Sequence, residues 1–361
     1  MKRRIVALLC ALLVTQLGAL VNPAYACGCG AMIPDGQSRI GVDRETSVVR
    51  WDGRTEQIVM RFTVGGDAHR AAWIMPVPSR AAVELGDGKM FDELGRLTLP
   101  EHKNRGYFWP REHDWPFSSG GMRDGAGAPA AGAAAPPVGV VGREQLGDFD
   151  VARLTATDPD ALKNWLEANG FKLPDRLATE VKPYVDQHWE YVAVRLAPRV
   201  GDEPLRGDLD PLRIRFDSDR LVYPMRLSRM ARTPQSLGLY VLADHRMEPA
   251  SPIGGSAPEV TFAGTIRPGT GPLAELAGAE SVFLTAIDQR FPEPGRIDAD
   301  HELRATAEDT PYRRAIYHDE LLTVGGVPVW LLTLAAAVAV LTATSLAVLR
   351  VRGRRRHPGR G

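Results

Sequence analysis

Two long apolar runs stand at the ends of the sequence, and shorter patterned segments lie between them. The first run, Ile5 to Val21, follows Lys2-Arg3-Arg4 and closes on Ala24-Tyr25-Ala26 before Cys27. A basic segment, an apolar segment and an Ala-x-Ala site are the parts of a secretory signal peptide. A signal anchor is the alternative, but this apolar run is short and the cleavage site is well formed. We therefore predict that residues 1–26 are a signal peptide, cleaved after Ala26.

The second run, residues 327–349, is 23 residues long and carries no charge. At about 1.5 Å per residue a helix of this length extends about 34 Å, enough for the roughly 30 Å hydrocarbon core of a membrane. Six arginines follow within residues 350–361, and such basic segments stay in the cytoplasm. A buried core helix is the alternative, but the length and the basic end argue against it. The pattern predicts a type I single-pass protein of the cell membrane, with a transmembrane helix at 327–349, a basic cytoplasmic tail at 350–361 and the ectodomain outside.

Between these ends, short segments with strand character recur. They are residues 57–64, 71–78, 149–154, 189–196, 212–216, 221–227, 237–243, 260–266 and 281–287. Asp158 and Pro159 are typical of a helix start, and Asn169-Gly170 of its end. A second helical segment begins near Pro174 and restarts at Pro183. We expect an α+β ectodomain with mainly antiparallel sheet and a helical pair.

One internal segment has a composition unlike the rest. Of the 22 residues from 118 to 139, 18 are Gly, Ala, Pro or Ser. Such a segment buries too little apolar surface to order itself, so residues 118–143 are predicted to be a flexible loop or linker. It divides the ectodomain into an N-terminal part, residues 27–117, and a C-terminal part, residues 144–324. The sequence leaves open whether it separates two domains or interrupts one.

Several short motifs occur in a fixed order and carry a family resemblance. They are Ala26-Cys27-Gly28-Cys29-Gly30, Trp73-Ile74-Met75-Pro76-Val77-Pro78, Leu146-Gly147-Asp148-Phe149-Asp150-Val151, Asp160-Ala161-Leu162-Lys163-Asn164-Trp165-Leu166 and Tyr223-Pro224-Met225-Arg226-Leu227-Ser228. Over about residues 26–250 the sequence resembles the bacterial envelope proteins grouped as domain of unknown function 2330. The resemblance implies an exported, often membrane-anchored protein without an established activity, and it carries no catalytic residues over.

Composition and charge narrow the class of partner. An apolar fraction of 44% and a charged fraction of 24% are typical of globular chains. The 44 basic and 44 acidic residues cancel, but three basic residues lie in the signal peptide and six in the tail. Cys27 to Leu349 therefore holds 35 basic and 44 acidic residues, a net charge of −9. An acidic exterior argues against nucleic acid as a partner and fits cations or basic partners better.

Two cysteines remain once Cys10 leaves with the signal peptide, namely Cys27 and Cys29. A local disulfide or two ordinary thiols in a Gly-rich turn is the simplest interpretation, because so small a loop cannot brace a core. A soft-metal or redox site is chemically possible, although two ligands do not fill a tetrahedral site. Lipidation of Cys27 is a third possibility, but Ala24 stands where a lipobox usually has Leu.

The densest other cluster of possible metal ligands contains Asp298, Asp300 and His301, which are candidate metal-binding residues. Glu112-His113-Asp114 and Asp244-His245 are further clusters of this kind. Asp-x-Asp occurs five times, a spacing that suits calcium, but none continues into a calcium-binding loop. The sequence contains no His-Glu-x-x-His, Gly-x-Ser-x-Gly or phosphate-loop motif. No cofactor is identified.

Aromatic residues gather in residues 107–117, which hold five of the chain's 25 aromatics. Trp109 and Trp115 in this segment are candidates for a binding surface toward glycan or protein, since indole rings supply large rigid contact area. The alternative is that these rings cover the sheet as part of the core.

These observations favour a non-catalytic binding or scaffolding module anchored in the cell envelope, with an envelope protein or a glycan as partner. A cell-envelope hydrolase is the second hypothesis, and it would have to assemble its site from distant residues such as His245, His301 and the acidic clusters. A thiol or metal-binding protein acting through Cys27 and Cys29 is the third.

Overall fold

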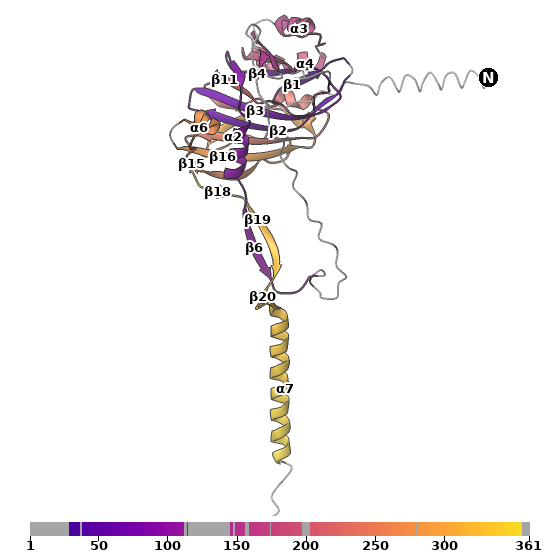
Figure 1. The fold of residues 1–361 in the computed structure, drawn as a ribbon, viewed down its shortest axis with the longest axis vertical. Coiled ribbons are helices and arrows are strands. Elements are labelled where there is room, and N and C mark those ends of the chain that lie inside the picture. The colour runs from indigo at the N-terminus through magenta and orange to yellow at the C-terminus, as the bar shows by residue number, and fades with distance from the viewer. Residues whose placement is uncertain are drawn as a thin grey trace, which may run out of the picture. The chain divides into compact units, whose positions relative to one another are not determined.

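The protein is described here by a computed structural model, in which the chain forms two compact units (Figure 1). One unit comprises residues 1–100 and 139–314, and the other residues 101–138 and 315–361. The structure describes residues 29–36, 38–111, 114, 145–146, 149–155, 159–173, 175–196, 203–278 and 281–355. The predicted signal peptide and the Gly/Ala/Pro-rich segment lie outside the described residues.

The first unit is built on a nine-stranded sheet in which the order is β18-β15-β16-β13-β2-β3-β11-β5, with β10 also pairing with β3. The β2–β13 pair is parallel and the other pairs are antiparallel. The strands are β2 (Ile40–Trp51), β3 (Thr55–Gly66), β5 (Ala82–Leu85), β10 (Gly207–Asp208), β11 (Leu212–Asp217), β13 (Gln235–Ala243), β15 (Glu259–Ile266), β16 (Val282–Phe291) and β18 (Tyr312–Arg313).

A second sheet of the same unit has the order β1-β4-β9-β8-β7, and a small third sheet has the order β12-β17-β14. The strands are β1 (Ala31–Pro34), β4 (Ala71–Val77), β7 (Gln145–Leu146), β8 (Phe149–Thr155), β9 (Glu190–Leu196), β12 (Leu221–Tyr223), β14 (Met247–Pro249) and β17 (His301–Ala305). Strand β4 precedes the Gly/Ala/Pro-rich segment and β9 follows it, yet the two strands pair. The sequence on both sides of that segment therefore builds one sheet.

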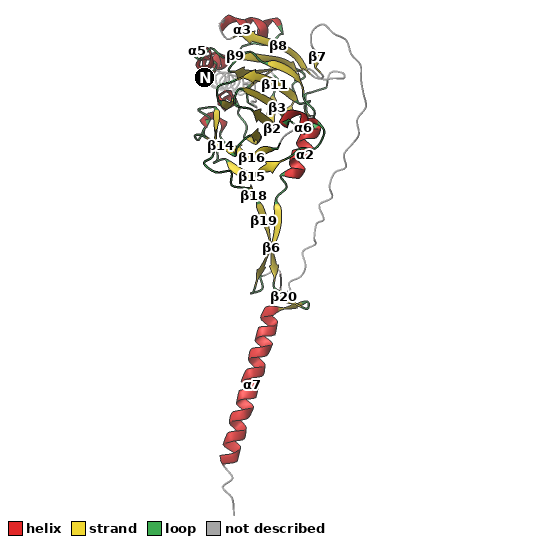
Figure 2. Cartoon of the chain, turned by 90° about the vertical axis from the view of Figure 1, so that its left-hand side faces the viewer, coloured by secondary structure: helices red, strands yellow, loops and turns green. Residues whose placement is uncertain are grey.

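The main core lies between the two large sheets, because alternate side chains of each strand point to opposite faces. Trp73 and Met75 of β4 belong to the same buried cluster as Met60 of β3. Their neighbours Ile74 and Val59 instead join separate clusters on the outer face of each sheet. Helices cover these outer faces, so the unit has helical layers on both sides of a sheet sandwich (Figure 2).

Helices are few in the described part of this unit. Residues of α3, α4, α5 and η2 pack with the outer face of the smaller sheet, and residues of α2 and α6 with that of the larger one. Their bounds are α2 (Lys89–Leu97), α3 (Pro159–Ala168), α4 (Asp175–Glu180), α5 (Lys182–Asp186), α6 (Pro272–Ala277), η2 (Arg226–Met230) and η3 (Pro294–Arg296).

The expectation of a mainly antiparallel sheet is confirmed, and eight of the nine predicted strands coincide with strands of the structure. The ninth, residues 221–227, was predicted too long. Strand β12 ends at Tyr223 because Pro224 has no N–H for a ladder. The Asp300 carboxylate then accepts the backbone N–H groups of Met225 and Arg226 at 2.8 Å each, and the chain turns into η2.

The second unit begins with a two-stranded parallel ribbon, in which β6 (Glu101–Tyr107) pairs with β19 (Ala315–Leu321). Arg105 and Arg111 reach Asp319 at 2.7 Å and 2.9 Å. The hydrogen bond from Arg105, with that from Arg111, lowers the pKa of Asp319 to about 2. Ion pairs between side chains therefore stabilise the ribbon, whose own side chains are mostly exposed to solvent.

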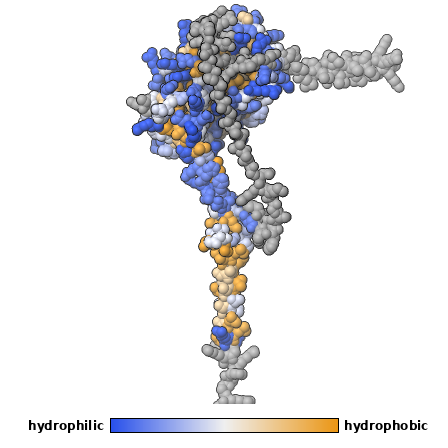
Figure 3. Space-filling model, viewed as in Figure 1, coloured by the Kyte–Doolittle hydropathy of each residue, from blue (hydrophilic) through white to orange (hydrophobic). Residues whose placement is uncertain are grey.

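The same unit ends in a hairpin and a long helix. Strands β20 (Thr323–Val324) and β21 (Val327–Pro328) pair, and α7 (Val329–Arg355) follows directly. Residues Val329–Arg352 are long and apolar enough to cross a membrane, and none of their most apolar stretch is buried in the protein. Figure 3 shows this apolar surface along the helix. Length and composition are thus compatible with membrane anchoring.

Candidate functional site

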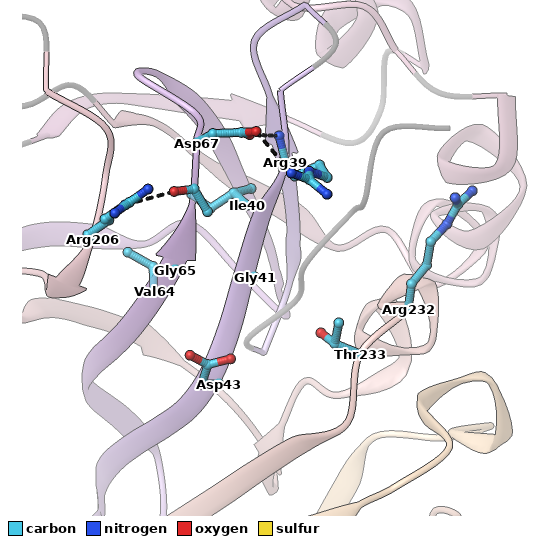
Figure 4. A pocket seen from close by; sticks show the side chains of 11 residues that line it. Arg39, Ile40, Gly41, Asp43, Val64, Gly65, Asp67, Arg206, Arg232 and Thr233 are labelled. Atoms are coloured by element: carbon cyan, nitrogen blue, oxygen red, sulfur yellow. Dashed lines mark hydrogen bonds and ion pairs between the residues drawn. The ribbon is translucent and has the colours of Figure 1, made fainter. Parts of the chain in front are cut away.

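An open groove lies beside the β2–β3 pair, where β2 begins and β3 ends (Figure 4). Its volume is about 740 Å³, within the range of pockets that bind small molecules. Glycines 65 and 66 contribute no side chains to its wall. The charged and polar side chains that line it are Arg39, Asp43, Asp67, Arg206, Arg232 and Thr233.

Two of these arginines are held in place by the turn at the end of β3. The Asp67 carboxylate accepts the backbone N–H of Arg39 at 2.6 Å and lies 3.3 Å from its guanidinium. The backbone N–H of Arg39 lowers the pKa of Asp67, and this carboxyl stays ionised. Arg206 donates from Nε to the carbonyl oxygen of Gly66 at 2.9 Å. Figure 4 shows Arg39 and Arg206 on either side of this turn.

Gly66 is required for this arrangement. Its φ is +143°, and a Cβ added there would lie 2.1 Å from the carbonyl oxygen of Arg39. Any other residue would therefore push β2 and β3 apart at the groove. The carbonyl oxygen that holds Arg206 belongs to this same glycine.

The groove offers hydrogen-bonding groups of both kinds. Guanidinium groups donate in a planar fork that matches carboxylate or phosphate oxygens. Carboxylates such as Asp43 accept from hydroxyl groups. The lining therefore suits a polar ligand that carries hydroxyls together with an acidic group.

A second polar group is buried inside the sandwich, around Glu45 of β2. Only 3% of Glu45 is exposed, and its carboxylate accepts the backbone N–H of Cys29 at 2.7 Å. The hydroxyl of Tyr223 donates to Glu45 and lies 2.6 Å from the hydroxyl of Ser47. Burial raises the pKa values of Glu45 and Tyr223. No motif in the sequence indicated this cluster, because its members come from distant segments; Tyr223 is 178 residues from Glu45.

Cys29 is a free, fully buried thiol, and burial raises its pKa well above the ordinary value. Cys27 lies outside the described residues. In this structure Cys29 forms no disulfide, and its thiol is buried between the sheets.

The cluster Asp298, Asp300 and His301 is divided among different environments. Asp298 is exposed, whereas Asp300 accepts the hydroxyl of Tyr184 at 2.7 Å besides its two backbone bonds. His301 is 2% exposed and lies 2.7 Å from Gln289. Among the residues that the structure describes, no group of three or more His, Cys, Asp or Glu side chains is arranged to hold a metal ion.

The other candidates are separated as well. Trp109 is 65% exposed and meets Phe108 edge to face, while Trp115 lies outside the described residues. His245 is exposed and lies 3.0 Å from Asp309.

Comparisons with known proteins give a family and no activity. No curated protein matches the chain. A solved structure titled as the crystal structure of baculovirus P35 is similar over 74% of this chain and 94% of that chain, at 9% identity and a TM-score of 0.30. A family model matches residues 23–304, which is most of the sequence. The chain therefore belongs to domain of unknown function 2330, described as an uncharacterized protein family conserved in bacteria.

Proposed function

We propose that the protein is an exported, membrane-anchored binding module whose globular unit captures a polar ligand of the cell envelope in the groove. The single observation that carries the proposal is the groove itself, with arginines fixed on the β3 turn and an aspartate beside them. The exposed apolar helix α7 supports anchoring. The signal-like residues 1–26 and the basic residues 350–361 support export with the globular unit outside.

The ligand class follows from the groove's chemistry. An acidic group would accept from the guanidiniums of Arg39 and Arg206, and ligand hydroxyls would donate to Asp43. An acidic glycan of the envelope combines these groups. Because Arg39 and Arg206 are already tied to Asp67 and Gly66, little further ordering is needed when the ligand binds.

A hydrolase remains the alternative function. Such an enzyme places a nucleophile beside its base, but His245 lies beside Asp309 and His301 beside Gln289. Within the described residues, no Ser, Thr or Cys side chain is hydrogen-bonded to either ring. Activity profiling of the full chain on envelope substrates tests this alternative, and turnover lost in His245→Gln would favour it.

The binding proposal is tested with the full chain in detergent micelles, titrated with acidic and with neutral envelope glycan fragments. Arg206→Ala should weaken binding of the acidic fragments about tenfold or more, because a hydrogen bond to a charged group contributes about 1.5–3 kcal/mol. Arg304→Ala is the matched control, since Arg304 is exposed, pairs with Glu248 at 3.0 Å and does not line the groove. Equal binding by the two variants would contradict the proposal.

A further inference from the structure

Three sulfur atoms meet between the two sheets. The thiol of Cys29 lies 3.6 Å from the thioether of Met60 and 4.0 Å from that of Met75. Met60 comes from β3 of the larger sheet and Met75 from β4 of the smaller one. Cys29 directly precedes β1, and all three residues are 0% exposed.

The two distances from the Cys29 thiol are close to the spacing of sulfur ligands around a bound metal ion. Metal–sulfur bonds are about 2.3 Å long, as at zinc sites, so a trigonal ion holds its three sulfur ligands about 4 Å apart. Thiolate and thioether together are soft ligands, and this donor type selects copper(I) over calcium, magnesium or manganese. The sulfur atoms could therefore hold such an ion with small side-chain movements.

A second observation also indicates a cation. The buried carboxyl group of Glu45 lies against Cys29, and its bonds come from neutral groups: the backbone N–H of Cys29 and the hydroxyls of Ser47 and Tyr223. Among the described residues, no basic side chain is hydrogen-bonded to it. A buried acid is normally balanced by a positive charge, and a monovalent cation beside Cys29 would supply one.

We propose that Cys29, Met60 and Met75 bind one copper(I) ion between the two sheets. As the ion enters, the Sγ–H bond of Cys29 breaks, a sulfur–copper bond forms and the proton passes to the adjacent Glu45 carboxylate, so the added positive charge neutralises that buried acid. Copper enters and stays as copper(I), so no electron is transferred.

The site is distinct from a chelate formed by Cys27 and Cys29. In that chelate both ligands would come from one turn, and the methionines would contribute nothing. Substitution of the methionines therefore separates the two arrangements. Leu has nearly the same volume as Met, so these variants are expected to fold.

The test titrates the full chain, without oxygen, with copper(I) held by a competing chromophoric chelator. We expect one equivalent to bind. Substitution of a residue that only supports a metal ligand lowers metal affinity about 10–100-fold. Removal of a ligand itself should cost at least the upper end of that range, so Met60→Leu, Met75→Leu and Cys29→Ser should each weaken copper(I) binding about 100-fold or more. Met230→Leu is the matched control, because Met230 is a buried methionine of a different cluster. Far-ultraviolet circular dichroism checks that each variant folds.

X-ray absorption of the loaded protein should show three sulfur neighbours in the wild type and two in either methionine variant. The proposal is overturned if the wild type binds no copper(I) more tightly than the chelator does. It is also overturned if Met60→Leu and Met75→Leu bind as the wild type does while Cys27→Ser abolishes binding. If Cys29→Ser does not fold, the two methionine variants decide the result.

Discussion

His301 should make the folded protein lose stability as the pH falls through the mildly acidic range. The ring is buried against Gln289, whose amide nitrogen donates to the carbonyl oxygens of Gly254 and Ser256. The carbonyl oxygen of Gln289 is thereby left to accept from Nε2–H of His301. Nδ1 then carries no proton and is buried without a hydrogen-bond partner among the described residues. A second proton would place an unpaired charge in the core.

The magnitude follows from the pKa of His301, which burial lowers from 6.5 to about 4. Each unit of difference between the folded and unfolded pKa corresponds to about 1.4 kcal/mol, so His301 accounts for about 3 kcal/mol. The sign is set by the unfolded chain, which binds the proton first. The stabilisation by neutral His301 is complete above pH 6.5 and is lost as the pH falls toward 4. Carboxyl groups titrate in part of the same range, so a variant must isolate the histidine.

The assay is urea unfolding of the wild type and of His301→Gln at pH 7.5 and at pH 4. Gln can still donate to Gln289 and does not titrate in this range. The fall in unfolding free energy between the two pH values should be about 3 kcal/mol smaller in the variant than in the wild type. His245→Gln is the control with the opposite sign, because the bond with Asp309 raises the pKa of exposed His245. Equal pH dependence of the wild type and His301→Gln would refute a buried, neutral His301.

Four further substitutions test other parts of the structure. Tyr223→Phe removes the hydroxyl that donates to Glu45 and should lower the unfolding free energy by about 1.5–3 kcal/mol. Tyr191→Phe, which loses one hydrogen bond to a carbonyl oxygen, should lower it by about 0.5–1.5 kcal/mol. Urea unfolding measures both losses, and equal losses would contradict a charge-assisted bond at Glu45. Burial raises the pKa of Glu56 well above 4.5, so the folded state loses stability as the pH rises through that pKa. The unfolding free energy of Glu56→Gln should therefore vary less with pH over this range than that of the wild type. The same pH dependence in the variant and the wild type would be evidence against a buried Glu56. Gly66→Ala should destabilise the protein by more than about 1 kcal/mol and abolish glycan binding, as thermal melting and titration would show. Val340→Arg adds about 2.5–3.5 kcal/mol to the insertion of α7 and should increase the share released by alkaline extraction of membranes, whereas full retention would contradict anchoring by α7.

Local patterns were sufficient to locate strands with clear apolar alternation or clear ends. Residues 71–78 are apolar and end on two prolines, and β4 lies there with all seven residues buried. The 12-residue strand β2, which is as long as its neighbour β3, was not predicted. Its run Asp43-Arg44-Glu45 resembles a loop, and the irregularity between Val42 and Arg44 resets the alternation of its side chains.

The groove and the buried cluster around Glu45 could not be predicted from the sequence, because folding brings together residues from distant segments. Glu45 is a charged residue in a core, and its placement depends on partners outside the local sequence, among them the hydroxyl of Tyr223, which is 178 residues away. The groove combines residues near 39 and 66 with Arg206 and Arg232. Conversely, Asp300 and His301 are neighbours in sequence, yet Asp300 accepts backbone N–H groups of the turn between β12 and η2, whereas His301 is buried against Gln289. Ligand-like spacing in the sequence did not correspond to a shared site.

Under the proposed function, the globular unit lies outside the membrane and binds an acidic glycan in its groove. The most direct measurement is binding of fluorescent acidic glycan fragments to intact spheroplasts that display the full chain. We expect saturable binding by the wild type and by Arg304→Ala, and loss of binding by Arg206→Ala when equal amounts of protein are displayed on the surface. Binding that appears only after the membrane is permeabilised, or that Arg206→Ala leaves unchanged, would contradict it.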